Sequence, residues 1–168
     1  MRQNGRSIQF YNVEKLREML LEALYEEWFS YYQFWISSRI MEPPGRSKVD
    51  PELLIYAKQE LNHAYLVVGR ILQLGGFPSI DPAGWMNMDH IQMYSSTKPN
   101  LEIILYQALL LKQAAIRTYR KIADFSRGHD ETTYHLVGTI LKEELEHKTD
   151  ILEWISEINR KSTRIFQA

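Results

Sequence analysis

Four long amphipathic segments limit what this chain of 168 residues can fold into. The helical spacing of apolar residues predicts helices over about residues 13–41, 51–74, 100–125 and 130–159. A helix of about 25 to 30 residues is roughly 40 Å long, because each residue adds about 1.5 Å. One small domain can bury four such helices only when they lie side by side. We therefore expect residues 1–168 to form a single all-α domain, a four-helix bundle.

Polar residues mark the expected beginnings of these helices. Asn12 and Asn100 precede the first and third segments, and Asp50 precedes a proline at the start of the second. Side chains of this kind accept hydrogen bonds from the first free backbone N–H groups of a helix. The fourth helix is expected to begin near Asp130.

The connections between the helices differ in length. The stretches "PPGRSKVD" and "SRGHD" are short, so the first two helices and the last two should each form an antiparallel pair. Residues 75–99 lie between the pairs, and extended chain gains about 3.3 Å per residue, so this connection can travel the length of the bundle. We expect two antiparallel pairs joined by a long crossover. The alternative is an up-and-down bundle with a loose excursion.

Composition excludes several classes of site and partner. The chain has no cysteine, which excludes disulfides and thiolate metal sites and is compatible with the reducing cytoplasm, where we expect the protein. No stretch approaches the roughly 20 apolar residues of a membrane span, so no membrane partner is expected. The basic residues near the ends are few and interleaved with neutral ones, which makes nucleic acid an unlikely partner.

Two polar pairs interrupt the apolar stripes of the second and fourth helices. Glu60 and His63 lie among apolar residues in "KQELNHAYLVV", and Glu144 and His147 repeat the same spacing in "LKEELEHKTDI". Side chains three residues apart project from one face of a helix, so each pair can reach a common point. Burying such groups without partners costs roughly several kcal/mol, so we expect each to have a partner or a ligand.

The chain looks internally duplicated around these pairs. Glu27 lies 33 residues before Glu60, and Lys112 lies 32 residues before Glu144. The octets that begin at these positions, "EWFSYYQF" and "KQAAIRTY", each have a small residue at the fourth place and an aromatic at the eighth. Glu27 and Lys112 are therefore equivalent positions on the first and third helices.

Four helices that each offer a carboxylate, two of them adding an imidazole, are typical of a binuclear site for oxygen-preferring first-row metals. Here the candidate metal ligands come from three of the four helices: Glu27, Glu60, His63, Glu144 and His147. The fourth position is altered, because a protonated lysine, Lys112, cannot be a ligand. Tyr31 and Tyr119 are candidates for hydrogen-bonding neighbours of the site, although aromatics at helical spacing usually belong to the core.

The segment "AIRTYRKIADFSRGHDETTYHLVGTILKEELEH", together with the matching Glu27 and Glu60 to His63 segments, resembles the ferritin-like superfamily over about residues 13–158. The resemblance is to its Dps-like, bacterioferritin-related branch. It implies iron as cofactor, one or two ions per chain, with manganese and zinc open as alternatives. It also implies iron oxidation and storage, or protection from peroxide in oxidative stress. The expected assembly is a homo-oligomer, either a dimer or a larger particle such as a dodecameric shell.

The sequence departs from that branch at two places in the expected metal centre. Where members often carry a cysteine pair, this chain has Ala114 and Ala123, and where they carry a ligand glutamate on the third helix it has Lys112. Two hypotheses stay open. In the first, the chain is a metal-binding protein with a weakened di-iron site, where Lys112 neutralises excess carboxylate charge or becomes a ligand after losing its proton. In the second, it is a non-catalytic shell or scaffold protein in which Lys112 pairs with Glu27, Glu60 and Glu144. Ferroxidase activity is left open, and no catalytic residue is assigned.

Overall fold

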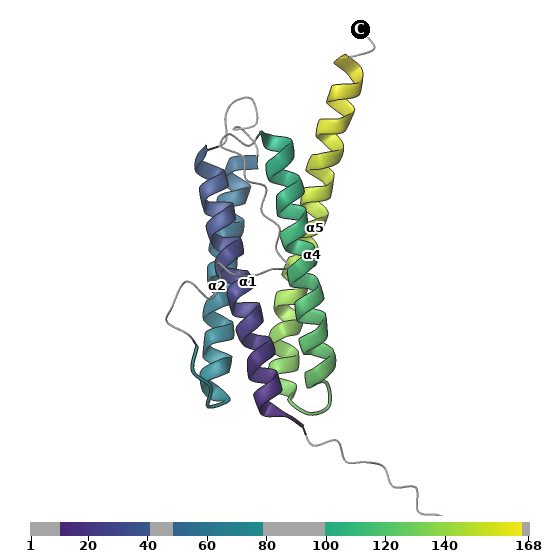
Figure 1. The fold of residues 1–168 in the computed structure, drawn as a ribbon. Helices are drawn as coiled ribbons and strands as arrows, with labels where there is room; N and C mark the ends of the chain where they lie inside the picture. Colours follow the sequence, from purple (N-terminus) through teal and green to yellow (C-terminus); the bar gives the residue numbers. More distant parts are fainter. Residues whose placement is uncertain (1–10, 41–48, 79–99, 166–168) are drawn as a thin grey trace, which may run out of the picture.

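The computed structural model describes residues 11–40, 49–78 and 100–165. These residues form four long helices, α1 (Val13–Ile40), α2 (Val49–Gln73), α4 (Leu101–Ser126) and α5 (Glu131–Ile165). The helices lie side by side along one direction (Figure 1). This confirms the predicted all-α bundle. Within the described ranges, no helix contains a stretch long and apolar enough to cross a membrane.

The pairing of the helices also follows the prediction. α1 packs mainly on α2 and α4 mainly on α5, while α1 and α4 join the two pairs. The end of α2 and the start of α4 lie at opposite ends of the bundle (Figure 1). The chain between them must therefore travel the bundle length, as expected of a long crossover and not of an up-and-down bundle. Most of the predicted crossover, residues 79–99, lies outside the described residues.

The helix starts agree with the capping predictions at Asn12 and Asn100 and differ at Asp50. Asn12 accepts a hydrogen bond from the backbone N of Lys15 at 3.0 Å, and Asn100 accepts one from Ile103 at 2.9 Å. The predicted cap Asp50 is wrong, because it lies inside α2. That helix begins at Val49, whose side chain is buried in the core.

α5 is longer than predicted. It continues to Ile165 instead of ending near residue 159, because no glycine or proline interrupts the sequence there. The last turns of α5 extend past the end of the bundle (Figure 1).

The core consists of two apolar clusters separated along the bundle by a polar layer. The first cluster contains Leu16 and Leu20 of α1 and Ile122 of α4 among others, and the second contains Leu53 of α2 and Leu105 of α4. Between them, each helix contributes buried polar residues at one level. This polar layer comprises Glu27, Glu60, His63, Lys112, Glu144 and His147.

One end of the bundle is held together by Asp130, which precedes α5. Its Oδ1 accepts a hydrogen bond from the backbone N of Thr133 at 3.0 Å, so it caps the helix. Its Oδ2 pairs with Arg70 of α2 at 2.5 Å and accepts a hydrogen bond from Tyr11 at 3.2 Å. Arg70 also donates to the hydroxyl of Thr133 at 2.7 Å. The cap of α5 is therefore also the link between α5, α2 and the start of α1.

We expect Asp130→Ala to lower the free energy of unfolding by about 1–3 kcal/mol, because it removes a helix cap and leaves Arg70 without its carboxylate. Denaturant unfolding at pH 7 measures the loss. Asp124→Ala is the control, since Asp124 is exposed and pairs with Arg127, the C-cap residue of the same helix, at 3.4 Å. Equal stability of the two variants would contradict this account of Asp130.

Candidate metal centre

The ammonium of Lys112 lies at the middle of the polar layer. Its Nζ donates to Oε1 of Glu60 at 2.6 Å and to Oε1 and Oε2 of Glu144 at 3.0 and 2.9 Å. All three side chains have an exposed fraction of 0%. α2 and α4 are not neighbours around the bundle, so Lys112 reaches across it to Glu60. Lys112 therefore links the carboxylate of Glu60 on α2 to that of Glu144 on α5.

Lys112 and the two carboxylates change one another's protonation. Burial would lower the pKa of Lys112, but the charges of Glu144 and Glu60 outweigh it and raise that pKa above its ordinary value. Burial would raise the pKa of Glu144, but Lys112 and His63 outweigh it and lower that pKa to about 2. Burial and the charge of Glu144 raise the pKa of Glu60, against the effect of Lys112. Lys112 is thus a permanent cation facing at least one permanent anion.

Glu27 differs from the other two carboxylates, because it is not within ion-pair distance of Lys112. Its Oε1 accepts a hydrogen bond from the hydroxyl of Tyr119 at 2.5 Å, and its Oε2 lies 3.4 Å from Nδ1 of His63. The predicted contact between Lys112 and Glu27 is therefore wrong. Tyr119 takes that place, since its side chain reaches Glu27 from two turns further along α4.

His63 contacts carboxylates through both ring nitrogens. Its Nδ1 lies 3.4 Å from Glu27 and 3.4 Å from Glu144, inside the centre. Its Nε2 lies 3.0 Å from Oε2 of Glu143, whose side chain is 35% exposed. Burial would lower the pKa of His63, but the charges of Glu144, Glu27 and Glu60 outweigh it and raise that pKa to about 11.

His147 has a different environment from its duplicate, His63. Its Nδ1 lies 3.8 Å from Oε1 of Glu60, and its ring stacks on Tyr56 with 4.1 Å between the centroids. The hydroxyl of Tyr56 donates to Asp150 at 2.9 Å, which fixes the ring. Burial and the charge of Lys112 lower the pKa of His147 to about 3. One histidine of the duplicated pair therefore faces anions, and the other is neutral at pH 7.

The two octets explain how each charge on α1 and α4 is accommodated. Phe34 and Tyr119 occupy the eighth places, so they are duplicates like Glu27 and Lys112. Tyr119 of α4 donates a hydrogen bond to Glu27 of α1, and the ring of Phe34 of α1 lies 5.0 Å from Nζ of Lys112 of α4. A hydroxyl donor suits an anion, and an aromatic face suits a cation. The lysine is therefore matched by its surroundings.

Four of the five predicted ligands lie close enough together to hold a metal ion. Ligand atoms of Glu27, Glu60, His63 and Glu144 all lie within 4.8 Å of one another. Glu27 Oε2, Glu60 Oε2 and His63 Nδ1 are buried and make no hydrogen bond to the described residues. A second ion would need ligands beside His147, where Lys112 supplies a cation instead. His147 itself lies outside the group of four.

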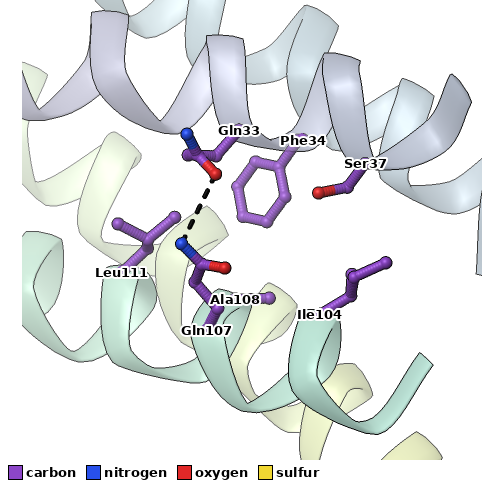
Figure 2. A pocket seen from close by; sticks show the side chains of 7 residues that line it. All are labelled: Gln33, Phe34, Ser37, Ile104, Gln107, Ala108 and Leu111. Atoms are coloured by element: carbon purple, nitrogen blue, oxygen red, sulfur yellow. Dashed lines mark hydrogen bonds between the residues drawn. The ribbon is translucent and has the colours of Figure 1, made fainter. Parts of the chain in front are cut away.

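A small pocket between α1 and α4 leaves no room for an organic substrate. It lies between α1 and α4, where Gln107 donates a hydrogen bond to Gln33 at 3.4 Å across a gap lined by Phe34 and Ile104 (Figure 2). Its cavity volume of ≈ 10 Å³ corresponds to about one water molecule.

The remaining expected neighbour, Tyr31, contacts Trp28 of its own helix with 6.0 Å between the centroids and packs against the second apolar cluster. Sequence reasoning missed Glu143, Tyr56 and Asp150, because each depends on a contact between two helices. The duplication contained one signal, since Glu143 precedes Glu144 where the neutral Gln59 precedes Glu60.

Comparison with known proteins agrees with this geometry. The model of the ferritin-like domain matches residues 17–161. The chain belongs to the ferritin-like family. This ferritin-like chain is 30% identical over 149 residues to the "DNA protection during starvation protein" of Pyrococcus furiosus, covering 88% of the chain and 78% of that protein. It is 25% identical over 140 residues to the bacterioferritin of Rhodobacter capsulatus, covering 83% and 81%.

Solved structures show the same relationship. The ferritin-like chain superposes on a dodecameric thioferritin, a bacterioferritin-related protein from Bacteroides fragilis, with a TM-score of 0.86, 34% identity and 91% of each chain covered. It superposes on the Rhodobacter capsulatus bacterioferritin, solved with a metal-free dinuclear site and a heme iron, with a TM-score of 0.74, 24% identity, and 88% and 87% covered. The resemblance seen in the sequence is therefore confirmed at the level of family and fold.

We expect Lys112→Met to lower the free energy of unfolding by about 3–5 kcal/mol at pH 7, because buried carboxylates lose their cation. The pKa of Glu144 is lowered to about 2, so its ion pair stabilises the fold above the unfolded pKa and loses effect as pH falls toward 2. The difference between wild type and variant should therefore shrink between pH 7 and pH 3.5. Denaturant unfolding at both pH values measures it.

Lys142→Met is the control for this substitution, since the Lys142 side chain is 77% exposed and pairs with Glu146 at 3.8 Å. It should change stability by less than about 0.5 kcal/mol at either pH. A Lys112→Met variant as stable as wild type at pH 7 would contradict the ionic role of Lys112.

Proposed function

We propose that this ferritin-like chain is a shell subunit whose centre binds one divalent metal ion, with the Lys112 ammonium in the place of a second. Iron is the expected metal, since the relatives include a bacterioferritin. The observation that carries the proposal is the position of Lys112 Nζ, between Glu60 and Glu144. The proposed role is iron binding and storage, or protection from peroxide, without fast two-metal ferroxidase chemistry.

Charge balance favours one ion over two. The three carboxylates of Glu27, Glu60 and Glu144 carry three negative charges when ionised, and their side chains are at most 1% exposed. The ammonium of Lys112 and one divalent ion together carry three positive charges. A second divalent ion would leave an excess of two positive charges in a buried site, which is strongly unfavourable. His147 adds no charge, because burial and Lys112 lower its pKa to about 3. His63, whose pKa is raised to about 11, would add none once the ion had displaced its Nδ1 proton.

Each residue has a definite part in such a site. Glu27, Glu60, His63 and Glu144 would hold the ion, which supplies Lewis acidity or a change of oxidation state when bound. Tyr119 orients Glu27 through its hydrogen bond. Lys112 holds Glu60 and Glu144 in place and takes up the negative charge that a second ion would otherwise neutralise.

A second candidate function is a shell subunit with no metal at all. The same contacts favour it, because Lys112 hydrogen-bonds both oxygens of Glu144 and so satisfies that carboxylate without a metal. In that case the polar layer only holds the four helices in register. The number of metal ions per chain distinguishes the two candidates.

We expect wild-type protein to bind one Fe(II) or Co(II) per chain, and Lys112→Glu/Phe34→Tyr to bind two. The double variant replaces a cation and its aromatic face by a carboxylate and a hydroxyl donor, which is the arrangement already present at Glu27 and Tyr119. It should also oxidise Fe(II) faster, since bridging two metals needs the fourth carboxylate. Elemental analysis after anaerobic loading and gel filtration gives the stoichiometry.

Phe34→Tyr alone is the control, and it should keep the wild-type stoichiometry. Wild-type protein that binds no metal would favour the metal-free shell. Wild-type protein that binds two ions and oxidises Fe(II) rapidly would overturn our account of Lys112.

We further propose that the chain assembles into a closed shell of about twelve subunits, since the similar thioferritin of Bacteroides fragilis is dodecameric. Several large apolar side chains of the helix pair α1 and α2 are exposed, including Tyr32 at 46% and Tyr65 at 77%. Exposed apolar surface of this kind is typical of subunit contacts. Light scattering coupled to gel filtration should show a single large particle of about twelve chains. A monodisperse monomer would contradict this proposal. Location in the cytoplasm stays a prediction from composition.

A further inference from the structure

We propose that a groove between the start of α1 and the end of α2 receives the C-terminal end of α5 from a second copy of the chain. The inference rests on the proposed shell and goes beyond it, because it names two surfaces that meet. The groove has a cavity volume of ≈ 330 Å³. The residues that line it include Glu14, Arg17, Glu18, Leu21, Ile71 and Phe77.

The turn after α2 forms one wall of the groove. Gly75 has a φ of 74°, which favours glycine, and a Cβ on Gly76 would come within 3.0 Å of the Ile71 side chain. The backbone N–H of Gly76 donates to the carbonyl of Ile71 at 2.9 Å. Nε of Arg17 donates to the carbonyl of Leu74 at 2.8 Å, which ties the end of α2 to α1. This wall is therefore formed by contacts within one chain.

The floor of the groove is apolar. Ile71 belongs to the first apolar cluster, and Leu21 packs against that cluster. Phe77 lies beside them and is 82% exposed, the largest value among the exposed large apolar side chains of the described residues. Exposed apolar surface next to a groove is typical of a contact with another chain.

The rim of the groove is acidic. Glu14 and Glu18 lie one turn apart on α1, and their side chains are 76% and 68% exposed. Arg17 also lines the groove, but its guanidinium is engaged by the carbonyl of Leu74 and by Glu14. Lys15 pairs with Glu18 at 3.1 Å in an exposed contact, which is weak and can be exchanged for a cation of a partner. The groove therefore suits an apolar segment that carries basic residues.

The end of α5 has this composition. Ile155 and Ile158 are the last residues of α5 that contact the second apolar cluster, yet the helix continues to Ile165. The sequence of residues 160–165, "RKSTRI", has three basic residues and no acidic one. Ile158, Ser162 and Ile165 recur at helical spacing, so they fall on one stripe. A short helical extension gains most of its stability from packing, so a partner is expected for it.

The partner must come from another copy of the chain. The groove lies where α1 begins and α2 ends, and the end of α5 lies at the opposite end of the bundle (Figure 1). The two surfaces differ, so the contact is head to tail and links each chain to two neighbours. A repeated contact of this kind closes into a ring or shell when the rotation between copies allows it.

Cysteine pairs test the contact directly, because the chain has no cysteine of its own. Phe77→Cys is combined with Ser162→Cys and, in a second variant, with Ile165→Cys. In the control it is combined with Thr139→Cys, an exposed position elsewhere on α5. After mild oxidation of the assembled protein, at least one of the two tail pairs should lose its monomer band on a non-reducing gel and give a ladder that extends beyond dimers. The control pair should stay monomeric on the gel.

Light scattering coupled to gel filtration gives a second readout. Removal of residues 161–168 should abolish the large particle, and so should Phe77→Ser, which alters an exposed side chain. Removal of residues 1–10 should leave the particle intact. Unfolding curves confirm that each variant is folded.

The outcomes separate this inference from the proposed shell. A large wild-type particle that gives no ladder with either tail pair, or that persists without residues 161–168, would overturn the inference and leave the shell standing. Wild-type protein that is monomeric would overturn both. A link within one chain in Phe77→Cys/Ser7→Cys, with no ladder from the tail pairs, would assign the groove to the N-terminal residues and also overturn the inference.

Discussion

The ion pair network of Lys112 is the interaction on which the rest of the structure depends. A lysine with no exposed surface is tolerated only because Glu60 and Glu144 lie at 2.6 and 2.9 Å from its Nζ. These three residues come from three helices, so one contact set fixes the relative positions of α2, α4 and α5. The polar layer also separates the two apolar clusters, which prevents the helices from sliding along one another without exposing a charge to apolar surroundings.

The same lysine makes a duplicated fold asymmetric in its chemistry. On one side, Glu27 receives a hydroxyl donor from Tyr119, and His63 has anions on both edges of its ring. On the other, Lys112 lies 5.0 Å from the centroid of an aromatic ring, and His147 is neutral and stacked on a tyrosine. The anion Glu27 thus has a hydrogen-bond donor beside it, and the cation Lys112 has an aromatic face. A single substitution of the lysine would therefore be less effective at restoring a two-metal centre than a substitution that also changes its aromatic neighbour.

Most single-helix signals predicted the structure, with the Asp50 cap and the end of α5 as exceptions, whereas contacts between two helices could not be read from the sequence. Asn100 was recognisable as a cap because its partner lies three residues away. Glu143 looked like any exposed glutamate of a helix, because its partner His63 lies 80 residues away. The predicted pairing of Lys112 with all three carboxylates failed for Glu27 for the same reason. The periodicity placed these side chains in one layer, but it carried no information on which of them would touch.

The sequence by itself determined the four helices, the long crossover, the buried polar layer and the replacement of one ligand by Lys112. These features depend on local periodicity and on the comparison of the chain's two halves. Both can be read from the linear amino-acid sequence. Only the tertiary structure decided the partners within the layer: Lys112 with Glu60 and Glu144, Glu27 with Tyr119, and His63 with Glu143. Helix rotation and the length of each side chain set those contacts. A shift of one or two ångströms changes a hydrogen bond while leaving the apolar pattern unaltered.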